Sequence, residues 1–392
     1  MVQNYKNDVI LSVEHLKTYF YQKRNQEPIR AVDDVSFQII RGSITAIVGQ
    51  SGSGKSVTSM SIFNLVDSPG KIVGGSIVLN GKNLLKLSNR ERNKIYGKEV
   101  TMIFQEPASA LNPVVKVKKQ MLEMIFLHQK MNRNVALEKC REALKRVNLK
   151  DTNTILEKYP FELSGGMCQR IMIAMAIVSN ADLLIADEPT TALDLTVQAV
   201  VLNEIKKLRD AGMSIMLITH DLGIVAQMAD YVYVMNDGKI VESGNVFDIF
   251  DHPQHEYTKK LLGYLNYSRN KGHDHRSEPE RTVPLVEVRH LHKTYAADRK
   301  KRRTVIDDMS FVINRGEIIG VVGRSGCGKS TLSRCLTGLE SYDSGEIIIK
   351  DGTQIQMIFQ DTGSSFNDRM TIEEIIAEPL MIKGGRKGNR GS

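Results

Sequence analysis

The chain has 392 residues, of which 41% are hydrophobic and 25% charged, an ordinary composition for a folded protein. This length accommodates two or three domains with sizeable cores, and the formal charge of +8 indicates a mild preference for anionic partners. The longest apolar run, Ile171 to Val178, is too short to cross a membrane, and nothing resembles a nucleic-acid-binding signature. We therefore expect no nucleic-acid partner, and any membrane association to depend on another protein.

The first predicted elements are short alternating segments, Val9–Val13 and Val35–Ile40, which favour strands at the edge of an antiparallel sheet. Ile44 to Val48 is a continuous apolar run, typical of a buried parallel strand, and Val57 to Leu65 indicates a helix. Between them lies the glycine-rich segment Gly49-Gln50-Ser51-Gly52-Ser53-Gly54-Lys55-Ser56.

This segment has the G-x-x-x-x-G-K-[ST] pattern of a phosphate-binding loop. Glycines let the backbone curl so that its N–H groups point at phosphate oxygens, and the following helix adds its positive end. Lys55 would bridge the β- and γ-phosphates of a nucleotide, and the Ser56 hydroxyl would ligate Mg²⁺. A plain glycine-rich turn is the competing interpretation.

Helical periodicity with many charges follows at Val117 to Val147, which predicts an inserted helical subdomain. A second candidate anion site, Leu163-Ser164-Gly165-Gly166-Met167, precedes the apolar helix Ile171–Val178. Taken alone, Ser164 and the two glycines would make an ordinary helix cap. Since one nucleotide does not need two cradles, we interpret this one as capping a nucleotide held by another unit.

Two further short strands end in polar residues. Leu183 to Ala186 leads into Asp187 and Glu188, where Asp187 suits the Mg²⁺ shell and Glu188 is placed to polarise an attacking water. Ser214 to Thr219 leads into His220, which could hydrogen-bond both the phosphate and the water. The competing interpretations are a solvated strand end and a structural histidine.

The beginning of this pattern recurs 274 positions later. Gly323-Arg324-Ser325-Gly326-Cys327-Gly328-Lys329-Ser330 repeats the loop, the run Ile318 to Val322 predicts a second buried strand, and Thr331 to Leu339 predicts a second helix. The polar segment Ser268 to Arg281 indicates a linker between the units. We therefore assign residues 1–267 to a first complete domain, 268–283 to a linker and 284–392 to the beginning of a second domain.

The motifs, in this order and spacing, resemble the ATP-binding subunit of ABC transporters. Tyr159 to Met167 and the tail His252 to Leu262 are similar to the branch that imports oligopeptides, dipeptides or nickel. The resemblance covers nearly the whole chain. It implies an α/β fold, a P-loop NTPase cassette with a mixed sheet core, an antiparallel β subdomain and a helical insertion, followed by a partial second cassette.

The resemblance also implies an activity and its partners. The chain would hydrolyse ATP with Mg²⁺ to power import, at the cytoplasmic face of the inner membrane. Its partners would be integral membrane permease subunits, a solute-binding protein that acts through them, and a second cassette, either a copy or a paralogue. A soluble ABC-type ATPase not coupled to transport and a non-hydrolytic remnant remain alternatives.

Several residue roles follow from the resemblance. Gln105 would be the Q-loop glutamine, which touches Mg²⁺ and the water, and Asp194 would lie at the dimer seam. Phe20, with Tyr19 as an alternative, and Tyr295 would stack on adenine, unless they pack in the core. The catalytic set would be Glu188, His220 and Gln105, and the Mg²⁺ set Ser56, Gln105, Asp187, Ser330 and Gln360.

The second unit carries only part of this set. Gln360 matches the Q-loop and Met370 to Leu380 resembles the start of the helical subdomain, but 32 residues follow Gln360 whereas 59 separate Gln105 from Ser164. We therefore expect a second unit that can bind nucleotide but has no acids of its own. A fragment of a fused two-cassette ATPase is the favoured explanation, and pairing of two chains through their first units is the alternative.

Overall fold

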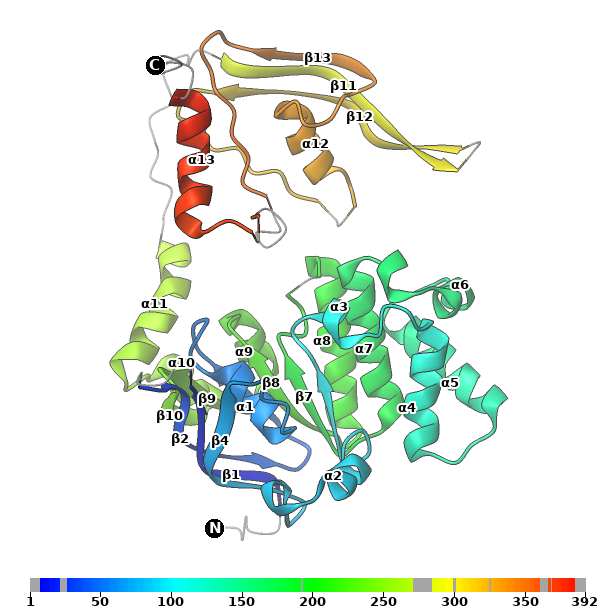
Figure 1. The fold of residues 1–392 in the computed structure, drawn as a ribbon, viewed down its shortest axis with the longest axis vertical. Coiled ribbons are helices and arrows are strands. Elements are labelled where there is room, and N and C mark those ends of the chain that lie inside the picture. The colour runs from blue at the N-terminus through cyan, green and yellow to red at the C-terminus, as the bar shows by residue number, and fades with distance from the viewer. Residues whose placement is uncertain are drawn as a thin grey trace, which may run out of the picture. The chain divides into compact units, whose positions relative to one another are not determined.

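The computed structural model describes residues 8–21, 27–191, 193–270, 284–298, 301–323, 326–359, 366–367 and 369–384. The chain divides into two compact units, Met1–His275 and Arg276–Ser392, which are considered separately below. Each unit combines an antiparallel sheet with helices (Figure 1). The assignment of the intervening segment as a linker stays a prediction, because residues 271–283 lie outside the described residues.

The first unit is built on a mixed six-stranded sheet with the order β10-β9-β3-β8-β7-β6. The strands β6, β7, β8, β3 and β9 run parallel, and β10 pairs antiparallel with β9. Every residue of β3, β7 and β8 is buried, as expected for apolar strands covered on both faces. The bounds are β3 Ile44–Val48, β6 Val100–Ile103, β7 Leu183–Asp187, β8 Ser214–Thr219, β9 Tyr231–Asn236 and β10 Lys239–Asn245.

A four-stranded antiparallel sheet, β2-β1-β4-β5, packs against this core through one shared apolar cluster. The predicted strands at Val9 and Val35 are confirmed but longer, because the two segments pair antiparallel from Val9 to Phe20, with several irregularities in register. The bounds are β1 Val9–Phe20, β2 Ile29–Ile40, β4 Gly70–Leu79 and β5 Lys82–Asn83.

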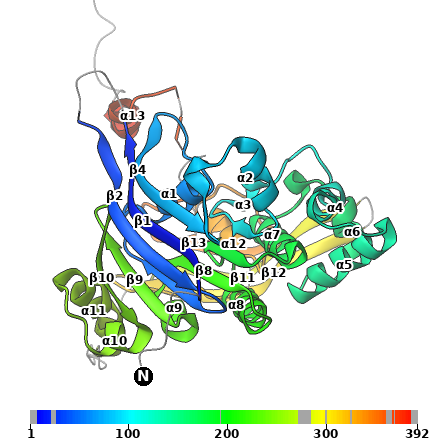
Figure 2. The ribbon, with the colours of Figure 1, turned by 90° about the horizontal axis from the view of Figure 1, so that it is seen from below.

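Helices complete the unit. The predicted helical insertion is confirmed as α4 and α5, which pack with α7 in a second apolar cluster. In both views α4, α5 and α6 lie away from the antiparallel strands β1, β2 and β4 (Figure 1, Figure 2). The bounds are α1 Lys55–Ile62, η2 Leu84–Lys86, α2 Asn89–Ile95, α3 Pro107–Ala110, α4 Val117–His128, α5 Arg133–Arg146, α6 Thr152–Glu157, η3 Pro160–Glu162, α7 Gly165–Ser179, α8 Leu195–Asp210, α9 Leu222–Met228, α10 Val246–Asp251 and α11 Glu256–Asn270.

The second unit has a three-stranded antiparallel sheet, β12-β11-β13, packed on α12. The helix expected at Thr331 begins at Lys329 and ends earlier, at Leu336, and the predicted start of a helical subdomain forms α13. The bounds are β11 Pro284–Asp298, β12 Lys301–Asn314, α12 Lys329–Leu336, β13 Ser344–Ile349 and α13 Ile372–Gly384.

The expected buried strand at Ile318–Val322 is wrong. This run has no strand structure, and Ile318 and Val322 are 91% and 92% exposed. In the first unit the corresponding strand, β3, is held between β8 and β9. The residues described after 323 supply no such neighbours, so the run has no ladder to join.

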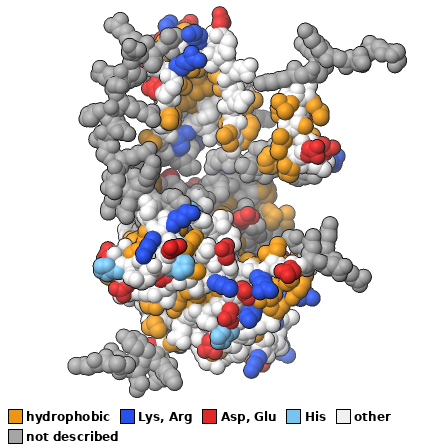
Figure 3. All heavy atoms as spheres, turned by 90° about the vertical axis from the view of Figure 1, so that its left-hand side faces the viewer, with side chains coloured by type: hydrophobic (Ala, Val, Ile, Leu, Met, Phe, Trp, Pro, Cys, Tyr) orange, Lys and Arg blue, Asp and Glu red, His pale blue; other side chains and the backbone are white. Residues whose placement is uncertain are grey.

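Exposed apolar side chains are a general feature of this unit, where Ile358, Leu380 and Ile382 are also open to solvent. Figure 3 shows hydrophobic side chains gathered on its surface. Among the residues described in either unit, none belongs to a helix with the length and hydropathy needed to span a bilayer.

Candidate functional site

The glycine-rich segment after β3 forms the predicted loop and ends at the first turn of α1. Gly52 and Gly54 have φ angles of 81° and 101°, which side-chain-bearing residues rarely adopt. A Cβ atom on Gly54 would lie 2.2 Å from the carbonyl oxygen of Ala31. Position 54 therefore requires glycine for two reasons: the positive φ angle, and the lack of room for a Cβ atom beside β2.

Lys55, the first residue of α1, is 7% exposed and turned back over the loop. Its Nζ donates to the carbonyl oxygens of Gly49 and Gln50, both at 2.8 Å. Burial lowers the pKa of Lys55, while the nearby carboxylates of Glu188 and Asp187 oppose that shift. The ammonium group thus donates to neutral carbonyl oxygens inside the loop. An anion bound in the loop would accept stronger hydrogen bonds from it.

Asp187 ends β7 directly beneath α1 and is 2% exposed. Its two carboxylate oxygens accept from Ser56 Oγ at 3.2 Å and from Ser59 Oγ at 3.3 Å. Burial raises the pKa of Asp187, and the two serine hydrogen bonds oppose the rise. The structure thereby brings together the predicted Mg²⁺ ligands Ser56 and Asp187.

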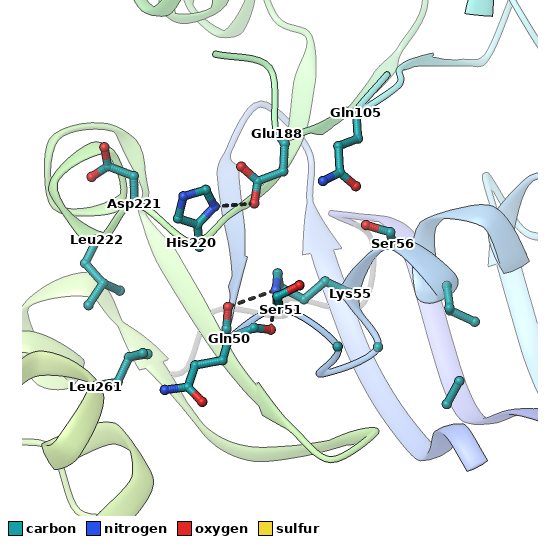
Figure 4. A pocket seen from close by; sticks show the side chains of 15 residues that line it. Gln50, Ser51, Lys55, Ser56, Gln105, Glu188, His220, Asp221, Leu222 and Leu261 are labelled. Carbon is teal, nitrogen blue, oxygen red and sulfur yellow. Dashed lines mark hydrogen bonds and ion pairs between the residues drawn. The ribbon is translucent and has the colours of Figure 1, made fainter. Parts of the chain in front are cut away.

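Glu188 follows with a left-handed φ of 50° and its N–H donates to Ile218 O of β8 at 2.9 Å. Its side chain is fixed at both oxygens: Oε1 lies 2.7 Å from His220 Nδ1, and Oε2 accepts from Thr191 Oγ1 at 2.8 Å. The carboxylate is buried, whereas the His220 side chain is 63% exposed. Gln105 faces this pair across the cavity (Figure 4).

These groups surround a cavity of about 760 Å³ at the carboxyl ends of β3, β7 and β8. Most predicted first-unit site residues line it, and Ser53 and Asp187 are buried beside it. The lining consists of Ala31, Gly49, Gln50, Ser51, Gly52, Gly54, Lys55, Ser56, Val57, Gln105, Glu188, His220, Asp221, Leu222 and Leu261.

The signature segment lies elsewhere in the unit. Ser164 caps α7 by accepting the Met167 N–H at 3.3 Å, as a helix cap would, and Leu163, Gly165 and Gly166 do not line the cavity. Asp194 caps α8 in the same way. Their roles opposite another cassette stay predictions.

The aromatic residues predicted to stack on adenine do not line the cavity either. Phe20 packs beside Gly70, and the Tyr19 hydroxyl donates to Asp33 Oδ1 at 2.6 Å. In the second unit, Tyr295 donates to Glu340. Adenine stacking by Phe20 or Tyr295 stays a prediction.

The second loop repeats the backbone geometry of the first. Gly328 caps α12 with a φ of 101°, the same as Gly54, and Lys329 Nζ donates to Gly323 O at 2.6 Å. Lys329 is less buried than Lys55, and Cys327 and Ser330 are exposed. Arg324, Ser325 and Gln360 lie outside the described residues.

The donor set fits a magnesium-bound nucleoside triphosphate. A Cβ on Gly49 or Gly54 would clash with the carbonyl oxygen of Met235 or Ala31, and the hydrogen bonds of Lys55 among the described residues go to two carbonyls and a hydroxyl. Ser56, Asp187 and Gln105 supply the oxygen atoms that Mg²⁺ prefers. Nearby, Glu188 can accept a proton from water.

Sequence reasoning did not identify Ser59, Thr191, Leu261 or Tyr257 as part of the site. Ser59 lies one helical turn after Ser56, a spacing that could have identified it. Tyr257 Oη accepts the N–H of Gln50 at 2.9 Å from 207 positions away, and no local pattern gives such a contact.

Comparison with known proteins agrees with this geometry. A family model described as "ABC transporter" matches residues 32–191 and 306–388. The glutathione import ATP-binding protein GsiA of Escherichia coli O6:H1 is 39% identical, over 96% of this chain and 68% of its own length. The peptidoglycan transport ATP-binding protein YejF of Agrobacterium fabrum is 40% identical, over 95% and 71%.

Solved structures give the same result. A dimeric ATP-binding cassette in a post-hydrolysis state, bound to ADP and Pi, aligns with a TM-score of 0.55 and 26% identity. The alignment covers 60% of this chain and 98% of that one. The P-loop cassette fold predicted from the sequence, with its mixed and antiparallel sheets, is thereby confirmed.

Proposed function

The chain belongs to the ABC transporter family, as an ATPase that uses ATP and Mg²⁺, and from this premise we propose that its first unit hydrolyses ATP to drive import of peptide-like solutes. The observation that carries the proposal is that Lys55 and Glu188 line one cavity, and that Asp187 is buried beside it and hydrogen-bonded to Ser56. Two acids and one lysine supply the charge and the base that phosphoryl transfer requires.

Each residue has a part in this proposal. ATP with Mg²⁺ supplies the transferable phosphoryl group and the cation that neutralises its oxygens. Lys55 would exchange its carbonyl partners for phosphate oxygens, and Ser56, Gln105 and Asp187 would hold the cation. Glu188 accepts a proton from the attacking water, while Thr191 and His220 fix its two oxygens.

The type of solute is inferred from relatives. Glutathione and peptidoglycan, the substrates in the names of the two relatives, both contain amino-acid units. We therefore favour peptide-like solutes over nickel. The proposed partners are integral permease subunits, a solute-binding protein acting through them and a second cassette, with the chain peripheral to the cytoplasmic face of the inner membrane.

The test is Glu188→Gln in the full chain assembled with its permease subunits. The substitution keeps the size of the side chain but removes the base, so we expect ATP turnover and peptide uptake to fall together by about 10²–10⁴-fold. ATP binding should persist. The matched control is Glu157→Gln, which changes an exposed carboxylate that does not line the cavity. Unchanged turnover in Glu188→Gln, or turnover without ATP-dependent uptake, would contradict the proposal.

A further inference from the structure

We propose that Tyr257 is a positioning residue for the first phosphate loop, through which α11 responds to nucleotide; this inference rests on the proposed function of that site. Its Oη accepts the backbone N–H of Gln50 at 2.9 Å. Gln50 is the first residue after Gly49, where the chain leaves β3 and begins to curl. The hydroxyl therefore fixes the backbone of the loop at Gln50, directly after the end of β3.

Tyr257 is itself held from several directions. Its N–H donates to His255 Nδ1 at 3.1 Å, and the Glu242 carboxylate of β10 accepts the N–H groups of Gln254 and His255 at 2.7 and 3.0 Å. These bonds fix the two residues that precede α11 to β10, the edge strand of the core sheet. A rigidly anchored hydroxyl is what a positioning contact requires.

The same helix also packs against two segments that border the cavity. Tyr257, Leu261 and Leu262 share an apolar cluster with Ala46 and Val48, which lead into the loop, and with Leu222, two residues after His220. Leu261 also lines the cavity (Figure 4). The helix thus links the loop that would hold phosphate to the segment that carries His220.

A consequence follows from thermodynamic linkage. If Tyr257 helps to order the loop for nucleotide, then nucleotide must in turn stabilise α11 to the same extent. Nucleotide bound at the first loop would therefore stabilise the helix that carries Tyr257 and Leu261. This contact gives the segment His252 to Leu262 a physical role in the nucleotide site.

The test uses the full chain with Lys329→Ala throughout, so that only the first loop is titrated. Tyr257→Phe removes the hydroxyl and keeps the ring. Loss of one hydrogen bond of average strength corresponds to about five-fold in an equilibrium constant, so we expect the KM for ATP to rise about five-fold with kcat unchanged. The control is Tyr231→Phe, which removes a hydroxyl that donates to Ser243 Oγ at 3.5 Å.

One further measurement separates positioning from a merely structural role. Hydrogen exchange of residues 256–263 should slow on adding ATP in the unaltered loop but not in Tyr257→Phe. Equal KM values with the same exchange response would overturn the inference, whereas failure of the unaltered chain to bind ATP would overturn the proposed function itself.

Discussion

At the residue scale, burial of the Asp187 carboxylate lowers the stability of the folded chain at neutral pH. Its carboxylate is buried and ordered by only two serine hydroxyls, and burial holds its pKa above the ordinary 3.8. An acid with a raised pKa binds its proton more tightly when folded. The free energy of unfolding therefore falls as the pH rises from about 3.8 through the folded-state pKa.

Asp187→Asn should therefore stabilise the nucleotide-free protein. At pH 7.5 we expect a Tm about 2–4 °C higher, the shift that roughly 1 kcal/mol gives in a domain of this size, together with loss of ATP hydrolysis. The advantage should shrink as the pH is lowered toward 4. Thermal unfolding across this range checks it, with the exposed Asp210→Asn as control. A lower Tm at pH 7.5 would contradict the argument.

At the scale of elements, the loop and helix α1 depend on glycines that are not equivalent. Gly52 and Gly54 both have positive φ, but a Cβ on Gly52 would meet nothing within 4 Å, whereas one on Gly54 would meet Ala31 O at 2.2 Å. Gly54→Ala should abolish nucleotide binding and lower the Tm by several degrees, and Gly52→Ala should do so much less. Calorimetric titration with ATP measures both, and equal losses would contradict the role of the close approach.

Helix α8 is tied to the helical insertion by a second buried carboxylate. Glu204 accepts from Arg146 of α5 and from Lys207, both at 2.7 Å. Burial favours a higher pKa for Glu204, but the two cationic donors outweigh it and leave the pKa below 4.5. Its stabilising effect is therefore present above pH 4.5 and lost as the pH falls through the folded-state pKa.

Glu204→Gln should weaken this tie between helices. Because both cationic partners are partly exposed, we expect a modest loss of about 1–2 kcal/mol, or roughly 2–8 °C in Tm, at pH 7.5. The difference from the unaltered chain should narrow below pH 4.5. Glu138→Gln, in an exposed pair on α5, is the control. A pH-independent difference would indicate packing instead of charge.

At this scale, the sequence predicts a feature well when neighbouring residues determine it, and poorly when contacts between distant segments determine it. The apolar runs of β3, β7 and β8 are local signals, and the motifs at their ends name many of the residues that line the cavity, although their roles stay predictions. The identical reasoning was wrong for Ile318–Val322, because a parallel strand needs neighbours as well as an apolar sequence. Tyr257 was missed for the related reason that its contact with Gln50 depends on the tertiary fold.

At the scale of the whole molecule, the two phosphate loops have similar backbone conformations but different surroundings. Gly54 and Gly328 have the same φ of 101°, and Lys55 and Lys329 each donate to the first glycine of their loop. Around Lys55 the ends of β7 and β8 bring in Asp187, Glu188 and His220. Among the described residues of the second unit, no strand stands in the place of β7 or β8.

Hydrolysis by this chain should therefore depend on one lysine. We expect Lys55→Ala to reduce ATP turnover to background, because the buried ammonium proposed to bind the phosphates is lost. Lys329→Ala should leave turnover within about two-fold, since no carboxylate equivalent to Glu188 is described beside that loop, and general-base catalysis contributes about 10²–10⁴-fold. Steady-state phosphate release from the full-length variants, with folding verified by circular dichroism, measures both. A large loss of turnover in Lys329→Ala would show that the second loop takes part in the catalytic cycle, and that hydrolysis at the first site requires both units.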